Sequence, residues 1–135
     1  MLTRLCGRIK TMENYNLKQY AHIGDAVWEL FVREECIKKT GDLKKLHNFT
    51  VSFVNAIFQA DLMSFLDNYL TEEEKELARR GRNLKMTVNK KSNPKIHSLA
   101  TSFEVLIGYF YLENKTRLEE IFEIIKKSLN DLKNN

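Results

Sequence analysis

Apolar residues recur at every third or fourth position through most of this chain, and this spacing is what most limits its fold. In residues 17–39, Ile23, Val27 and Leu30 lie on one face of a predicted helix. The same period continues in three further segments, 43–66, 94–112 and 116–129. No segment alternates apolar and polar residues as a strand would, and no hairpin turn or repeat is visible. The pattern predicts an all-α domain of about five or six helices.

Residues that cap helices separate these segments. The expected N-caps are Asp42, Thr71, Asn93 and Thr116. Thr71 and Thr116 are each followed three residues later by glutamate, which is the capping-box spacing. Pro94 directly follows Asn93 and suits the first helical position. We expect Gly81 to end the short helix that Thr71 opens, and residues 82–92 to form a loop.

A chain of 135 residues is most simply one domain. We assign residues 17–133 to it and residues 1–16 to an N-terminal extension, either disordered or part of an upstream start. No apolar run approaches the roughly 20 residues of a membrane span, and the N-terminus lacks a signal-peptide core. We therefore expect no membrane partner and a cytoplasmic location. Cys6 and Cys36 form no CxxC pair, which argues against structural zinc.

Two acids, Asp25 and Glu104, interrupt otherwise apolar helical stretches. Burying an unpaired carboxylate is costly, so each should have a partner or bind a metal ion. Gly24 precedes Asp25, and Gly108 follows Glu104 by one turn. Glycine inside a helix costs about 1 kcal/mol relative to alanine, so both glycines need a packing or functional reason. The spacing predicts a close helix crossing with one shared cation site, although a structural network with Arg or Lys is the alternative.

The chain has no acidic residue between Glu76 and Glu104, yet this interval carries seven positive charges. The whole chain has 22 Lys and Arg against 18 Asp and Glu, so the remainder is mildly acidic. Such a concentration of charge suits a polyanion. The candidate contacts, including one neutral asparagine, are Arg79, Arg80, Arg82, Asn83, Lys85, Lys90, Lys91 and Lys95.

Several sequence blocks occur in a specific order and spacing. They are Gly24-Asp25-Ala26-Val27, Leu46-His47, Leu70-Thr71-Glu72-Glu73-Glu74, Arg79-Arg80-Gly81-Arg82-Asn83 and Phe103-Glu104-Val105-Leu106-Ile107-Gly108. Together they resemble the catalytic domain of ribonuclease III, and more closely its compact form, the Mini-ribonuclease III family. The resemblance covers roughly residues 17–131. We also expect no double-stranded-RNA-binding domain, as in the compact family.

The resemblance implies a ribonuclease III-like helical fold with a basic loop, acting as a homodimer on double-stranded RNA. In that family the acids of the first and last motifs are catalytic and bind Mg²⁺, with Mn²⁺ as a substitute. They correspond to Asp25 and Glu104. Mg²⁺ takes oxygen ligands and keeps several waters, so few protein ligands are needed. It can activate a water and neutralise charge that develops on the phosphate.

The resemblance also implies a biological task. The family trims the ends of the 23S ribosomal RNA precursor, a step in ribosome biogenesis, and a ribosomal protein is a further expected partner. The basic segment then becomes the expected RNA-binding surface, contacting phosphates without reading sequence. Double-stranded RNA is recognised largely by its shape.

Two positions depart from full-length ribonuclease III, in which a second acid precedes each main one. Ala21 and Thr101 occupy these positions in this chain, so we expect a metal site with fewer carboxylates and a weaker metal affinity. Thr101 is a candidate for orienting a metal-bound water. Glu29 lies one turn after Asp25 and either joins the site or pairs with Arg33 at i+4.

The histidines are not tied by spacing to any nucleophile, so we assign none of them a catalytic role. We assign His22 to packing or to the subunit contact, and Trp28 to the core or to the same contact. Two other functions stay open. One is a non-catalytic RNA-binding ribosome-assembly factor of the same fold, and the other is a helical regulator that binds DNA. Retention of both acids favours the enzyme.

Overall fold

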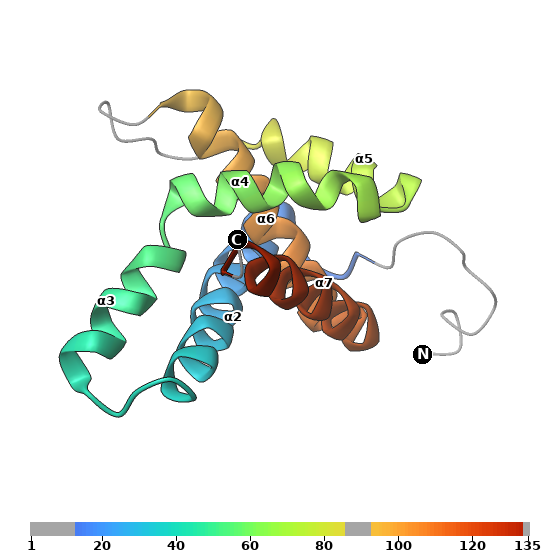
Figure 1. Cartoon of the computed structure of the whole chain (residues 1–135). Coiled ribbons are helices and arrows are strands. Elements are labelled where there is room, and N and C mark those ends of the chain that lie inside the picture. The colour runs from blue at the N-terminus through green and yellow to red at the C-terminus, as the bar shows by residue number, and fades with distance from the viewer. Residues whose placement is uncertain (1–12, 86–92, 134–135) are drawn as a thin grey trace.

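The computed structural model describes residues 13–85 and 93–133, with side chains placed as far as residue 130. Within these ranges it contains six α-helices, one 3-10 turn and no strand, which confirms the all-α prediction (Figure 1). The elements are α2 (Leu17–Ile37), α3 (Leu43–Phe53), α4 (Ala56–Leu66), η1 (Asp67–Tyr69), α5 (Glu72–Arg82), α6 (Pro94–Glu113) and α7 (Lys115–Lys133).

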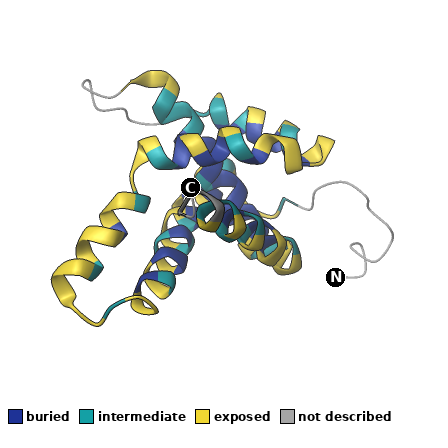
Figure 2. Cartoon of the chain, in the orientation of Figure 1, coloured by how far each residue is buried: buried dark blue, intermediate teal, exposed yellow. Residues whose placement is uncertain are grey.

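Helix α6 is the centre of the fold, and α2, α4, α5 and α7 all pack against it. Its residues from 100 to 110 are buried, except for the half-buried Glu104. A helix that is buried on nearly all sides needs an almost continuous apolar sequence. By contrast α3 lies at the edge, contacts only α2 and α4 extensively, and buries Thr50 alone (Figure 2).

The apolar segment 43–66 is two helices rather than one. Helix α3 ends at Phe53 and α4 begins at Ala56, with a bend of 53° between α3 and the segment 56–69. Asn55 causes the restart, because its Oδ1 accepts a hydrogen bond from the backbone N–H of Phe58 at 2.9 Å. This is an N-cap, and an N-cap residue is not helical in its own backbone.

Three of the four expected N-caps are confirmed, namely Asp42, Thr71 and Asn93. The capping box predicted at Thr116 is wrong. Helix α7 begins at Lys115, and Asn114 Oδ1 accepts a hydrogen bond from the backbone N–H of Arg117 at 3.2 Å. The expected stop at Gly81 is also wrong, because α5 continues to Arg82.

Residues 13–16, which we assigned to the N-terminal extension, are anchored on the fold. Asn14 Nδ2 donates to Glu113 Oε1 at 2.8 Å, and the hydroxyl of Tyr20 donates to Glu113 Oε2 at 2.6 Å. The side chain of Asn16 caps α2 in a capping box with Gln19. Residues 1–12 lie outside the described residues, so for them the assignment to an extension stays a prediction.

A pair of charges joins α7 to the rest of the fold. The Arg117 guanidinium donates to both carboxylate oxygens of Glu74 at 2.9 Å and to the carbonyl of Tyr69 at 2.7 Å. The two side chains are 18% and 12% exposed, and such bidentate pairs are strong. No single helix of the described residues is long and apolar enough to cross a membrane; α3 with the segment 56–69 meets that test only as a bent pair.

Candidate active site

Helices α2 and α6 touch through two glycines. A Cβ atom on Gly24 would lie 1.8 Å from the carbonyl oxygen of Glu104, and one on Gly108 would lie 1.8 Å from the carbonyl oxygen of Tyr20. Neither position therefore has room for a side chain. The reciprocal pairing also shows that the two helices run antiparallel at this point. The predicted close crossing is confirmed.

The crossing brings Asp25 and Glu104 together, close enough for the Asp25 side chain to raise the pKa of the Glu104 carboxyl group. Glu104 is half-buried between the helices, whereas Asp25 is exposed. The expectation that both acids occupy core positions is therefore wrong for Asp25. Gly24 faces α6, so the next residue along α2 points toward the outer face. One carboxyl is fixed inside the fold, and the other remains accessible to a ligand.

Burial raises the pKa of Glu104 to about 8, and the hydrogen bond and negative charge of Asp25 act in the same direction. Among the described residues, no cationic side chain contributes to this shift. The alternative of a structural network with Arg or Lys thus finds no support at Glu104. Two adjacent carboxyl groups resist losing both protons, and a cation bound between them would stabilise the doubly ionised form.

The donor set is small. No group of three or more His, Cys, Asp or Glu side chains gathers anywhere in residues 13–85 or 93–130. Two carboxyl groups fit a hard divalent cation that keeps several of its waters. Glu29 does not add to the set, since Arg33 holds its carboxylate at 2.9 Å, as the surface-pair alternative predicted.

The two positions that lack the additional acids are both buried. Ala21 is 2% exposed and Thr101 is 3% exposed. Ala21 belongs to the apolar core cluster, so a carboxylate there would be costly. The water-orienting role of Thr101 stays a prediction.

The first two arginines of the basic segment are already paired. Arg79 donates to Glu76, with Nη2 and Oε2 2.5 Å apart. Arg80 Nη1 donates to both carboxylate oxygens of Glu13, at 2.8 and 2.9 Å. Sequence reasoning missed this second pair, because its members are 67 residues apart and no local pattern relates them.

The rest of the segment begins where α5 ends. Arg82 is half-buried, and its carbonyl accepts a hydrogen bond from the hydroxyl of Ser98 at 2.5 Å. Asn83 is the C-cap of α5, while Lys85 and Lys95 are exposed. Lys90 and Lys91 lie outside the described residues.

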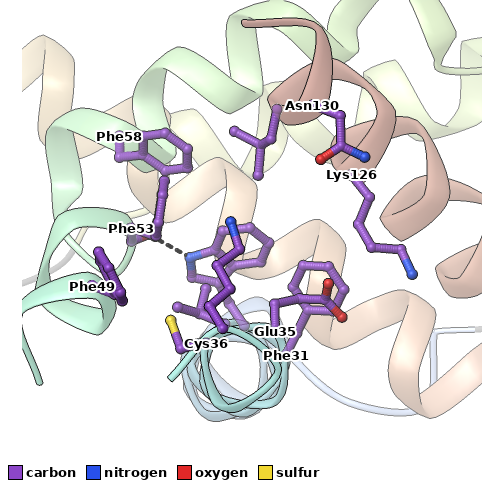
Figure 3. A pocket seen from close by; sticks show the side chains of 12 residues that line it. Phe31, Glu35, Cys36, Phe49, Phe53, Phe58, Lys126 and Asn130 are labelled. Atoms are coloured by element: carbon purple, nitrogen blue, oxygen red, sulfur yellow. Dashed lines mark hydrogen bonds between the residues drawn. The ribbon is translucent and has the colours of Figure 1, made fainter. Parts of the chain in front are cut away.

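A cavity of about 550 Å³ lies between α2, α3, α4 and α7, and aromatic and other apolar side chains make up most of its lining (Figure 3). Neither Asp25 nor Glu104 lines it, so it is separate from the candidate active site. Trp28 does line it, is 1% exposed, and donates its indole N–H to the carbonyl of Phe53 at 2.8 Å. The structure thus favours the core alternative for Trp28. His22 is exposed and lines a smaller cavity with Ile23 and Leu112.

Comparisons with known proteins show the family to which the chain belongs. The family model of the ribonuclease III domain matches residues 18–115, a range that includes both acids. The chain is 41% identical over 113 residues to Mini-ribonuclease 3 of Gloeobacter violaceus, covering 84% of each protein. It is 42% identical over 109 residues to Mini-ribonuclease 3 of Clostridium tetani, covering 78% of this chain and 72% of that one.

A solved structure has the same fold. The crystal structure of a Fusobacterium nucleatum protein superimposes with a TM-score of 0.77 at 28% sequence identity, covering 87% of this chain and 98% of that one. The family match and the sequence identities point to the same group of proteins. The chain therefore belongs to the ribonuclease III family of endoribonucleases and groups with the proteins called Mini-ribonuclease 3.

Proposed function

We propose that this protein is an Mg²⁺-dependent endoribonuclease specific for double-stranded RNA, with Asp25 and Glu104 as its catalytic and metal-binding residues. The observation that carries the proposal is the pair of adjoining carboxyl groups at the α2–α6 crossing. The family match covers this crossing, which supports the same assignment.

Asp25 and Glu104 would hold the ion, and Mn²⁺ would be able to replace Mg²⁺. When bound, the ion would supply a polarised water and neutralise charge on the phosphodiester. Glu104 would position its carboxylate from inside the fold, after giving up the proton that burial favours. Asp25, being exposed, leaves the solvent side free for the RNA phosphate. Thr101 is proposed to orient a water, and the glycine contact keeps the two carboxyl groups adjacent.

The proposed substrate follows from the basic segment. Arg79, Arg80, Arg82, Asn83, Lys85 and Lys95, with Lys90 and Lys91, would contact the RNA backbone. A homodimer would present one acid pair to each strand and leave a short 3′ overhang, with His22 at the subunit contact. The specific substrate we propose is the stem formed by the ends of the 23S ribosomal RNA precursor, in the cytoplasm, with a ribosomal protein as an accessory partner.

The test is cleavage of long double-stranded RNA with Mg²⁺, by the wild type and by Asp25→Asn. Single-stranded RNA of the same composition is the substrate control, and Asp61→Asn, at an exposed position on α4, is the matched protein control. We expect duplex cleavage by the wild type and by Asp61→Asn, and none by Asp25→Asn. Cleavage by Asp25→Asn at the wild-type rate would overturn the assignment of the acid pair.

A second candidate function is a non-catalytic RNA-binding factor in ribosome assembly. The buried Ala21 and Thr101, at positions where larger enzymes carry acids, favour it to some degree. The same assay separates the two functions. Duplex binding by both the wild type and Asp25→Asn, without cleavage under any divalent-metal condition, would support the assembly factor.

A further inference from the structure

The carboxylate of Glu13 forms an ion pair with Arg80, one of the arginines of the basic segment. Both of its carboxylate oxygens accept hydrogen bonds from Arg80 Nη1, at 2.9 and 2.8 Å. The arrangement places two anionic oxygens on one guanidinium nitrogen, and the oxygens of an RNA phosphate are charged acceptors for arginine in the same way. Glu76 lies on α5, one turn before Arg80, and pairs with Arg79. It is the last acidic residue before Glu104.

Glu13 is held near Arg80 by contacts that do not depend on its own carboxylate. The neighbouring Asn14 donates its backbone N–H to the hydroxyl of Tyr20 at 2.9 Å and its side-chain amide to Glu113 at 2.8 Å. The hydroxyl of Tyr20 is bonded to Glu113 in turn. Glu13 could therefore release Arg80 while the segment stays in place.

The ion pair between Arg80 and Glu13 is exposed enough for another anion to replace the carboxylate. The Arg80 side chain is 41% exposed and that of Glu13 is 22% exposed. Ion pairs that remain in contact with water contribute little to stability, so an incoming phosphate can replace the carboxylate. The pair between Arg117 and Glu74, at 18% and 12% exposure with a further bond to a carbonyl, lacks this accessibility.

We propose that Glu13 is a built-in competitor for the RNA backbone, which holds Arg80 in the free protein and releases it to a phosphate when a duplex binds. The proposal rests on the RNA-binding function proposed above. It assigns regulation of that binding to the segment before α2. The carboxylate lowers affinity for RNA and for non-specific polyanions, since each duplex must first displace it.

The test measures binding of a duplex RNA in metal-chelated buffer, which excludes cleavage, at several salt concentrations. Glu13→Gln should bind the duplex about two- to fivefold more tightly at low salt. Its log–log salt slope should stay close to that of the wild type, because Arg80 contacts a phosphate in both complexes. Glu72→Gln is the matched control, because it removes the same charge from an exposed acid of α5 that does not contact Arg80. Urea unfolding of each variant checks that the fold is retained.

A double-mutant cycle assigns the effect to Arg80. Arg80→Ala should weaken binding clearly in the Glu13→Gln background and much less in the wild type. Equal gains from Glu13→Gln and Glu72→Gln would overturn the proposal, since the effect would be one of overall charge. Lower stability with unchanged or weaker binding would overturn it as well, leaving a purely structural pair. If the wild type binds no duplex, the proposed function itself fails.

Discussion

Gly24 of α2 and Gly108 of α6 form one contact between two helices, in which each glycine lies against the backbone of the opposite helix. The atoms that a methyl group would meet at 1.8 Å are the carbonyl oxygens of Glu104 and Tyr20, which belong to helix backbones and cannot move aside. This contact sets the separation of the helices that carry Asp25 and Glu104. Packing and the candidate active site therefore depend on the same two glycines.

We expect Gly24→Ala and Gly108→Ala to lower the free energy of unfolding by about 3 kcal/mol or more, because overpacking against backbone forces the helices apart. Urea unfolding measures this change. Gly41→Ala is the control, since nothing lies within 4 Å of a Cβ there. It should change stability by less than about 1 kcal/mol. Equal stability of all three variants would mean that the helices do not cross this closely.

The pH dependence of stability should carry the signature of Glu104. Its pKa is about 8 in the folded chain, against an unfolded value of about 4.3. Between these values the folded state binds more protons than the unfolded state, so the free energy of unfolding falls as pH rises. The contribution of Glu104 to the free energy of unfolding is fully present below about pH 4 and is lost by about pH 8. Because Glu104 is partly exposed, solvent screening reduces the effect, and we expect the free energy of unfolding to fall by on the order of 2 kcal/mol.

Glu104→Gln tests this relation, because the amide keeps the shape and removes the titration. Urea unfolding at about pH 5 and about pH 8, in metal-free buffer, should show a smaller decline for the variant than for the wild type. Glu72→Gln, at an exposed acid, should follow the wild type. Parallel declines for all three proteins would show that Glu104 ionises normally in the folded state.

The sequence predicted the acid pair because its signals are local to each helix. Apolar spacing identified the two helices, and a glycine beside or one turn from each acid indicated close approach. Periodicity did not predict correctly whether Asp25 faces the core or the solvent. Its neighbour Gly24 is buried against α6 while Asp25 is exposed, and a one-residue step around a helix separates those two environments.

Other features depend on contacts that no local pattern contains. Asn55 in an apolar run resembles a tolerated polar residue, yet it caps α4 and breaks the helix. The capping-box spacing at Thr116 predicted the wrong N-cap. The side chain of Asn114, two residues earlier, caps α7 instead. Pairing of Glu13 with Arg80 requires the folded chain, because the two residues are 67 positions apart and come together only when α2 and α5 both pack on α6.

Arg117→Ala should destabilise the fold by about 2–4 kcal/mol, because it leaves the carboxylate of Glu74 poorly solvated and without its guanidinium partner. The same arginine also bonds the carbonyl of Tyr69, so the last helix loses two attachments at once. Arg33→Ala removes an exposed i,i+4 pair and should cost less than about 1 kcal/mol. Thermal or urea unfolding compares them, and similar losses for both would contradict the assigned strength of the Arg117 pair.

Mg²⁺ should stabilise the folded chain through Asp25 and Glu104. A ligand that binds only the folded state adds about 1.4 kcal/mol at ten times its Kd, and this is measured as a rise in Tm with Mg²⁺ concentration. Asp25→Asn removes one of two proposed ligands, so the rise should largely vanish. Asp61→Asn, an exposed acid on α4, should keep it. A rise of equal size in all three proteins would place the bound ion away from the acid pair.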